Sequence, residues 1–179
     1  AVLRENAVTP DFPELTLPQM LRRQAERRPR HTAIRQKDFG IWQPTDYAGY
    51  AARSRDVAHG LAALGVPRGG HVAVVSENRI EWVLAQLGAG MAGAVTVGVY
   101  PTSPAPEVGY VLEHSDSEVV VCEDQEQVDK VLEVRDRLPC LKRIVVVETK
   151  GMRAYGDAPV ISFAASSKTS SPAGGSVAL

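Results

Sequence analysis

The stretch HVAVVSENRIEWVLAQLGAGMAGAVTVGVY, residues 71–100, decides the fold class of this chain. Its first part, HVAVV, is a continuous apolar run of the kind found in strands that are covered on both faces. Helical spacing of apolar residues follows over 79–93, and AVTVGVY at 94–100 is a second apolar run. A strand, a helix and a strand in this order predict two parallel strands joined by a right-handed crossover.

The same alternation continues toward the C-terminus. Apolar runs at 117–123 and 141–149 predict two more strands, and helical patterns at 105–116 and 125–139 precede them. Four strands separated by three helices predict an α/β fold, with a mainly parallel sheet and helices on both of its faces.

The N-terminal part of the chain has a different pattern. An amphipathic helix is expected over 17–29, and two alternating segments predict a hairpin that turns at residues 38–40. A second helix is expected over 47–65, with Thr45 or Asp46 as its cap. These elements lead directly into the strand at residue 71.

We expect three parts in the chain: an N-terminal lead over 1–15, an α/β subdomain over 16–163 and a tail over 164–179. The tail is rich in Ser, Ala and Gly and has no periodicity. This composition is typical of a flexible segment. The sequence leaves open whether the tail is a natural feature of the protein.

The composition limits the classes of function. The 179 residues are 44% hydrophobic and carry a formal net charge of -1, which gives no general attraction to nucleic acid. The five arginines within 22–30 are interpreted as a solvated helix face, although they could meet lipid head groups. With two cysteines and no His cluster at metal-ligand spacing, we expect no metal site.

The location of the protein is inferred from what the chain does not contain. It has no signal-peptide pattern and no apolar run of the roughly 18 residues that a bilayer requires. The sequence therefore predicts a cytoplasmic protein, with peripheral membrane contact as an open alternative.

Three glycines within 88–93 match the spacing G-x-G-x-x-G of a dinucleotide-binding loop. Such a loop must follow a strand and open a helix, so that free N–H groups point at pyrophosphate. Gly88, Gly90 and Gly93 instead fall at the end of the predicted helix and lead into a strand. We therefore interpret them as close-packing positions and regard a nicotinamide-dependent oxidoreductase as a weak alternative.

Polar side chains follow the first two strands of the predicted sheet. Ser76 or Asn78 is expected to cap the helix after the first strand, and the loop YPTSP follows the second strand. In open α/β sheets, ligands bind outside the carboxyl ends of the strands. The residues predicted to bind substrate are therefore Arg79, Tyr100, Thr102 and Ser103.

The ordered series of these elements resembles the N-terminal portion of the AMP-forming acyl-CoA synthetases over about Leu17 to Phe163. It comprises TLPQMLRRQAERRPRHTAI at 16–34, WQPTDYAGY at 42–50, the segment from GLAALG to VVVCED at 60–124, and LPCLKRIVVVE at 138–148. The segment that starts at YPTSPAP is similar to the long-chain fatty-acyl group in particular.

The resemblance implies a two-step reaction in the parent enzyme. A fatty-acid carboxylate attacks the α-phosphate of ATP in the presence of Mg²⁺, and the CoA thiol then displaces AMP from the acyl-adenylate. The family's phosphate loop, adenylate-binding stretch, ribose-binding Asp and lid Lys correspond to no residue of this sequence. The resemblance therefore implies a fragment that has no catalytic residue, binds no cofactor alone and is inactive alone. It also implies that the fragment contributes one wall of the acyl and CoA channel.

Two further expectations accompany this hypothesis. The alternative function is a stand-alone α/β module that binds a ligand or regulates a partner protein. Self-association through an exposed packing face is expected for a chain whose parent enzyme is larger. The acyl chain length is not encoded in this part of the sequence.

Overall fold

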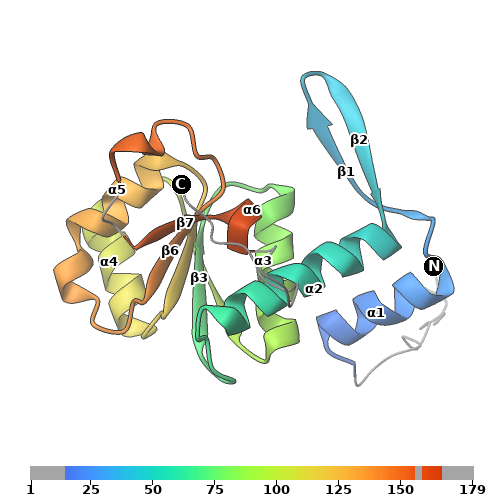
Figure 1. Cartoon of the computed structure of the whole chain (residues 1–179), viewed down its shortest axis with the longest axis horizontal. Coiled ribbons are helices and arrows are strands. Elements are labelled where there is room, and N and C mark those ends of the chain that lie inside the picture. The colour runs from blue at the N-terminus through green and yellow to red at the C-terminus, as the bar shows by residue number, and fades with distance from the viewer. Residues whose placement is uncertain (1–14, 156–158, 167–179) are drawn as a thin grey trace, which may run out of the picture.

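The computed structural model describes residues 15–155 and 159–166, and its centre is a five-stranded parallel sheet (Figure 1). The strand order is β4-β3-β5-β6-β7, and every neighbouring pair is parallel. The strands are β3 (His71–Val75), β4 (Val95–Val99), β5 (Val119–Cys122), β6 (Arg143–Val146) and β7 (Val160–Ser162). The predicted α/β class is confirmed, and β7 is an addition, because three residues are too few for a recognisable apolar pattern.

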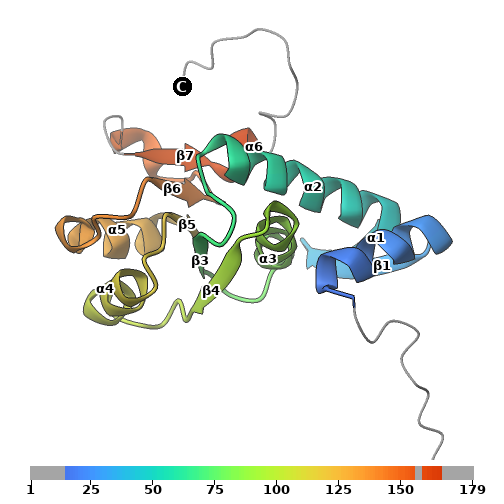
Figure 2. The same ribbon diagram turned by 90° about the horizontal axis from the view of Figure 1, so that it is seen from below.

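Helices cover both faces of the sheet (Figure 2). Helices α2 (Tyr47–Ala63) and α3 (Ile80–Ala92) lie on one face, and α4 (Ala105–His114) and α5 (Gln125–Glu133) lie on the other. Each face has its own hydrophobic cluster, one around Val72 and Leu84 and one around Val120 and Leu112. Successive residues of a strand point to opposite faces, so one apolar run supplies both clusters.

The N-terminal part forms helix α1 (Leu17–Arg27) and the predicted hairpin of β1 (Thr32–Asp38) and β2 (Ile41–Asp46). The hairpin is a separate two-stranded sheet that projects away from the main sheet (Figure 1). Asp46 caps α2 as expected, since its Oδ1 accepts a hydrogen bond from the backbone N–H of Gly49 at 2.7 Å.

The glycine motif lies at the C-terminal end of α3, as predicted. Gly93 ends the helix with a φ of +79°, in the left-handed region that favours glycine. Gly88 faces α2 so closely that an added Cβ would lie 2.6 Å from Val57 Cγ1. The motif therefore serves packing, and the oxidoreductase alternative is removed.

The N-terminal end of α3 differs from the expectation. The predicted capping of α3 by Ser76 or Asn78 is wrong, because its N-cap is Arg79, whose side chain makes no capping hydrogen bond. Ser76 Oγ instead donates to the Glu77 carbonyl at 3.0 Å. The short elements that remain are the 3₁₀ turns η1 (Arg135–Arg137) and η2 (Met152–Ala154) and the helix α6 (Phe163–Ser166).

The predicted lead over 1–15 lies almost wholly outside the described residues, and so does the tail over 164–179 apart from the end of α6. No helix in the described ranges has the length and hydropathy needed to cross a membrane.

Candidate functional site

The carboxyl edge of the main sheet contains a topological switch point. The chain passes from β3 to β4 on one side and then returns to β5 on the other side of β3. This order is the 2-1-3-4-5 arrangement of doubly wound sheets, in which the strands are numbered along the chain. Ligands bind to such sheets in the crevice between strands 1 and 3. The crevice of this chain therefore lies between the ends of β3 and β5.

Arg79 occupies the region beyond these strand ends and contacts three carboxylates. Its Nε lies 2.7 Å from Glu81 Oε2, and its Nη1 lies 3.2 Å from Glu123 Oε1 and 2.8 Å from Glu148 Oε1. Glu123 follows β5 and Glu148 follows β6, so one guanidinium links the ends of three strands. Hydrogen bonds between charged groups are stronger than neutral ones, so the arrangement fixes the loops.

Glu123 fills the crevice itself. Its Oε2 accepts a hydrogen bond from the backbone N–H of Glu77 at 2.7 Å and lies 3.2 Å from Ser76 Oγ, whose single proton it shares with the Glu77 carbonyl. In nucleotide-binding folds, a backbone N–H at this position points to a ligand phosphate. Here the carboxylate of Glu123 takes the place of that anion.

The charge balance also disfavours a phosphate at this point. Burial by itself lowers the pKa of the Arg79 guanidinium, but hydrogen bonds to Glu148 and Glu81 and the charge of Glu123 outweigh this effect and raise the pKa above its ordinary value. Arg79 therefore stays charged, yet three carboxylates against one cation leave the cluster negative. An ATP phosphate meets repulsion here, so the described residues do not fit this group.

The loop after β4 has a different character. Tyr100 is 80% exposed, Thr102 is exposed and Ser103 is half-buried, and the N–H of Ser103 bonds to the Tyr100 carbonyl at 3.1 Å. Lys130 of α5 donates a hydrogen bond to the Pro101 carbonyl at 2.6 Å. The hydrogen bond from Lys130 thus fixes the loop to α5, and the loop presents an aromatic ring and hydroxyl groups to solvent.

The structure places the predicted residues on one edge of the sheet but in two groups. Tyr100, Thr102 and Ser103 follow β4, whereas two of the three carboxylates that Arg79 contacts follow β5 and β6, on the other side of β3. Their roles as substrate-binding residues remain predictions, and Arg79 is already engaged by its three carboxylates.

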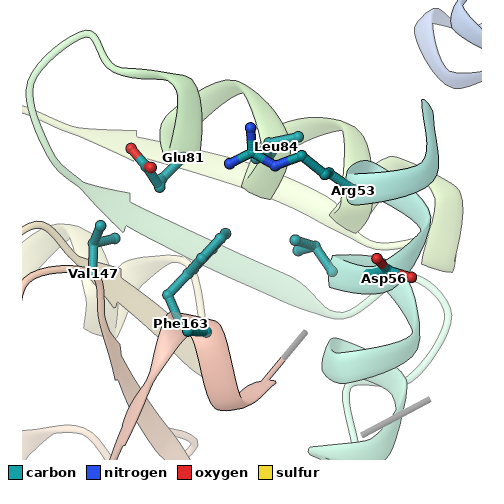
Figure 3. Close-up of a pocket in the computed structure, with 8 residues that line it drawn as sticks. Arg53, Asp56, Glu81, Leu84, Val147 and Phe163 are labelled. Atoms are coloured by element: carbon teal, nitrogen blue, oxygen red, sulfur yellow. The ribbon is translucent and has the colours of Figure 1, made fainter. Parts of the chain in front are cut away.

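A partly enclosed hollow of about 250 Å³ lies beside the Arg79 cluster (Figure 3). Its apolar wall includes Val57, Leu84, Val147 and Phe163, and its polar lining includes Glu81. Arg53 and Asp56 of α2 complete the polar part of the lining. The hollow combines an apolar floor with charged groups, although it is small for a typical ligand pocket.

Metal and thiol chemistry find little support at this edge. Within residues 15–155 and 159–166, no group of three His, Cys, Asp or Glu side chains could hold a metal ion. Cys122 ends β5 and is fully buried, and burial raises the pKa of its thiol, so the reactive thiolate is disfavoured. The described residues do not fit Mg²⁺ any better than they fit the phosphates.

Sequence reasoning missed Glu123, Glu148 and Lys130. A usable signal existed for the two acids, because each comes directly after or close to the end of an apolar strand, in VVVCED and IVVVET. Residues at strand ends meet at one edge of a parallel sheet. No comparable signal marked Lys130, which reaches its carbonyl partner from the middle of α5.

Comparison with known proteins gives consistent matches. The family model of AMP-binding enzymes matches residues 21–176 of this chain. A long-chain-fatty-acid–CoA ligase of Xenopus laevis is 31% identical over 141 residues, which are 79% of this chain and 19% of the relative. The chain spans about a fifth of the length of this relative and of two mammalian long-chain-fatty-acid–CoA ligases that it also matches.

Solved structures agree with this result. A fatty acyl CoA synthetase of Mycobacterium tuberculosis shares 26% identity at a TM-score of 0.65, over 78% of this chain and 28% of that chain. An anthranilate CoA ligase in complex with anthranoyl-AMP shares 26% identity at a TM-score of 0.65, over 73% of this chain and 24% of that chain.

Proposed function

The chain belongs to the AMP-binding enzyme family of adenylate-forming acyl-CoA ligases, and we propose that it forms the N-terminal subdomain of a long-chain fatty-acid–CoA ligase. The family predicted from the sequence is confirmed. In the whole enzyme, ATP and Mg²⁺ activate the fatty acid as an adenylate, and CoA then takes up the acyl group. This chain provides one wall of the channel for the acyl group and CoA.

The observation that carries the proposal is the loop over Tyr100–Ser103. It lies at the carboxyl edge of the sheet, is fixed by Lys130 and contains no charged residue. An exposed aromatic ring and hydroxyl groups suit the apolar and amide portions of an acyl-CoA better than its phosphates. We therefore assign the loop to the acyl and pantetheine part of the substrate.

The same geometry supports the proposal that this chain alone forms no adenylate. The backbone N–H of Glu77 already has an anionic partner in Glu123, and the Arg79 cluster is negative. Adenylate formation depends on neutralising phosphate charge in the transition state. Residues that perform this step must therefore come from a part of the enzyme other than the described edge.

Two measurements on the same preparation test the proposal. Titration with a fluorescent long-chain acyl-CoA should show saturable binding that Tyr100→Ala weakens by about tenfold, as expected when a large aromatic contact is lost. Tyr110→Ala is the matched control, because Tyr110 is also exposed but lies on α4. Equal affinity of both variants would remove the assignment of the loop.

Hydroxylamine trapping of an acyl-adenylate, with ATP, Mg²⁺ and a panel of fatty acids, provides the second measurement. We expect no product from this chain. Product formation would show that the phosphate chemistry is present after all, and would contradict the role given to Glu123.

A stand-alone ligand-binding or regulatory module is the second candidate. The observation that favours it is Glu123, whose carboxylate accepts the hydrogen bonds of the polar groups in the crevice without a ligand. Such a module would bind its ligand without regard to the Tyr100–Ser103 loop, so acyl-CoA affinity that is insensitive to Tyr100→Ala would favour it.

A further inference from the structure

The tip of the β1–β2 hairpin exposes three large apolar side chains. Phe39 is 98% exposed, Ile41 is 65% exposed and Trp42 is 62% exposed. They are neighbours in sequence, and the hairpin that carries them stands away from the main sheet (Figure 1). Single exposed apolar residues need no explanation, but a group of them on a projecting segment marks an interaction site.

The backbone at the tip supports this interpretation. Phe39 has a φ of +43° and Gly40 a φ of +83°, so both central residues of the turn are in the left-handed region. Turns of this kind favour Asn or Asp before Gly, and a bulky residue there is strained. The sequence thus keeps a large apolar side chain where both water and the backbone disfavour it, which points to a function for that side chain.

The strand register places two cations on the same face as Trp42. Lys37 is the partner of Trp42, and Arg35 is the partner of Pro44 on that face. The alternate residue Gln36 points the other way, since its Oε1 accepts a hydrogen bond from the N–H of Ile80 in the main body. Arg35, Lys37, Trp42 and Pro44 therefore form the outer face of the hairpin.

The cations of this outer face have no counter-charges. Arg35 and Lys37 are exposed and make no ion pair with any residue of the described ranges. A face that packs into a protein interior does not carry unpaired cations, because their burial is costly. The outer face instead suits a surface that is apolar inside and anionic at its boundary.

The charge of the wider region has the same sign. Residues 16–46 contain seven Arg or Lys and three Asp or Glu, a net charge of +4, although the whole chain carries -1. An anionic surface therefore attracts the end of the molecule that bears the hairpin. The N-terminal region is oriented toward such a surface before any close contact forms.

We propose that the β1–β2 hairpin is a contact site for an anionic lipid surface. Phe39 enters the boundary of the acyl region, Trp42 lies at the level of the head groups, and Arg35 and Lys37 meet lipid phosphates or carboxylates. Aromatic rings and basic side chains share this distribution at membrane interfaces. The proposal goes beyond the ligase role and does not depend on it.

Sedimentation of the full chain with vesicles tests the proposal. We expect binding to vesicles of phosphatidylcholine and phosphatidylserine, and much weaker binding to phosphatidylcholine alone. The double variant Arg35→Gln/Lys37→Gln should bind the anionic vesicles about twenty-five-fold more weakly, at about fivefold for each cation. Arg55→Gln, an exposed cation of α2, is the matched control and should bind as the wild type does.

Phe39→Asn separates a lipid contact from a loss of structure. Asn adopts the left-handed region readily, so the variant should unfold at the same or a higher temperature than the wild type. Its affinity for anionic vesicles should nevertheless fall, by about fivefold for the lost apolar contact. Tyr110→Asn on α4 removes an exposed aromatic ring elsewhere and should leave vesicle binding unchanged.

Three results would overturn the proposal. The wild type could fail to sediment with anionic vesicles, or the hairpin variants could bind as the wild type does. Binding to a single-stranded oligothymidylate but not to vesicles, with the same sensitivity to Lys37→Gln and Phe39→Asn, would assign the hairpin to nucleic acid instead.

Discussion

The main sheet and the β1–β2 hairpin treat their polar and apolar groups in opposite ways. The strands β3 and β5 are buried along nearly their whole length, and at their ends Arg79 and Glu123 satisfy each other. The hairpin exposes Phe39 and Trp42, and Lys37 forms no ion pair within the part of the chain that the structure describes. Stability and recognition are therefore assigned to different parts of one short chain, and mutations in the two parts should differ in effect.

Truncation of a core side chain should give the largest effect on stability. Leu84 of α3 is almost fully buried in the cluster between α3 and the sheet. We expect Leu84→Ala to lower the free energy of unfolding by about 3 kcal/mol, through lost burial and a residual cavity. Chemical denaturation measured by circular dichroism gives this value.

The matched truncation in the hairpin is Ile41→Ala, which removes an apolar side chain that is largely exposed. Its effect should be within about 0.5 kcal/mol of zero. A cost similar to that of Leu84→Ala would show that the hairpin tip is packed in solution, and the contrast between the two parts would disappear.

A smaller effect is expected where α2 and α3 approach each other. An added Cβ at Gly88 would lie 2.6 Å from Val57 Cγ1 and 3.1 Å from the backbone N of Ala58. Gly88→Ala should therefore destabilise the chain by about 1 to 2 kcal/mol, because overpacking outweighs the gain in helix propensity.

Gly98→Ala is the control for this prediction. A Cβ at Gly98 meets only Trp82, at an ordinary contact distance of 3.5 Å. This variant should be neutral or slightly more stable. Thermal melts of both variants decide the point, and a stabilising Gly88→Ala would contradict the packing role of the glycine motif.

The hydrogen bonds of Glu123 in the crevice should contribute less to the free energy of unfolding than the packing at Gly88 does. Glu123→Ala removes the acceptor for the Glu77 N–H and one partner of Arg79. We expect a loss of about 1 kcal/mol, typical of a partly buried hydrogen-bonded group. Glu126→Ala, which removes the exposed partner of an ion pair with Lys130, should cost at most about 0.5 kcal/mol. Equal losses in urea denaturation would mean that Glu123 is not a structural anchor.

The fold could be predicted from the sequence to the extent that buried strands impose a pattern. The runs HVAVV and SEVVVCE contain almost only apolar residues because both of their faces are covered, and their spacing gave the order of strands and helices. The strand β7 was not predicted, since three residues are too few to show a periodic pattern. Asp46 was predictable as a cap because it precedes an amphipathic helix, whereas the cap of α3 was not.

The candidate site was less predictable, and the reason is spatial. Arg79, Tyr100, Thr102 and Ser103 were found because each follows an apolar strand. The sequence could not show that Arg79 reaches across to Glu148, 69 residues later, and so is already neutralised. The sequence also could not show that Lys37 lies on the same face of the hairpin as Trp42. This position follows from the cross-strand register, which the turn sets.

The last effect depends on pH and concerns Tyr50, which packs between the cluster of the main sheet and the cluster that holds α1. Its ring is half-buried there. Burial, with a smaller effect of Tyr47, raises the pKa of Tyr50 from 10.0 to about 12. Because the unfolded chain loses this proton first, stability should fall as the pH rises from about 10 to about 12. Solvent screening limits the loss to about 1 kcal/mol.

Denaturation between pH 10 and pH 12 should show a shallower decline in stability for Tyr50→Phe than for the wild type. Tyr155 and the lysines titrate in both proteins and therefore contribute equally to both curves. Parallel curves would mean that Tyr50 is not buried between the sheet cluster and the cluster that holds α1.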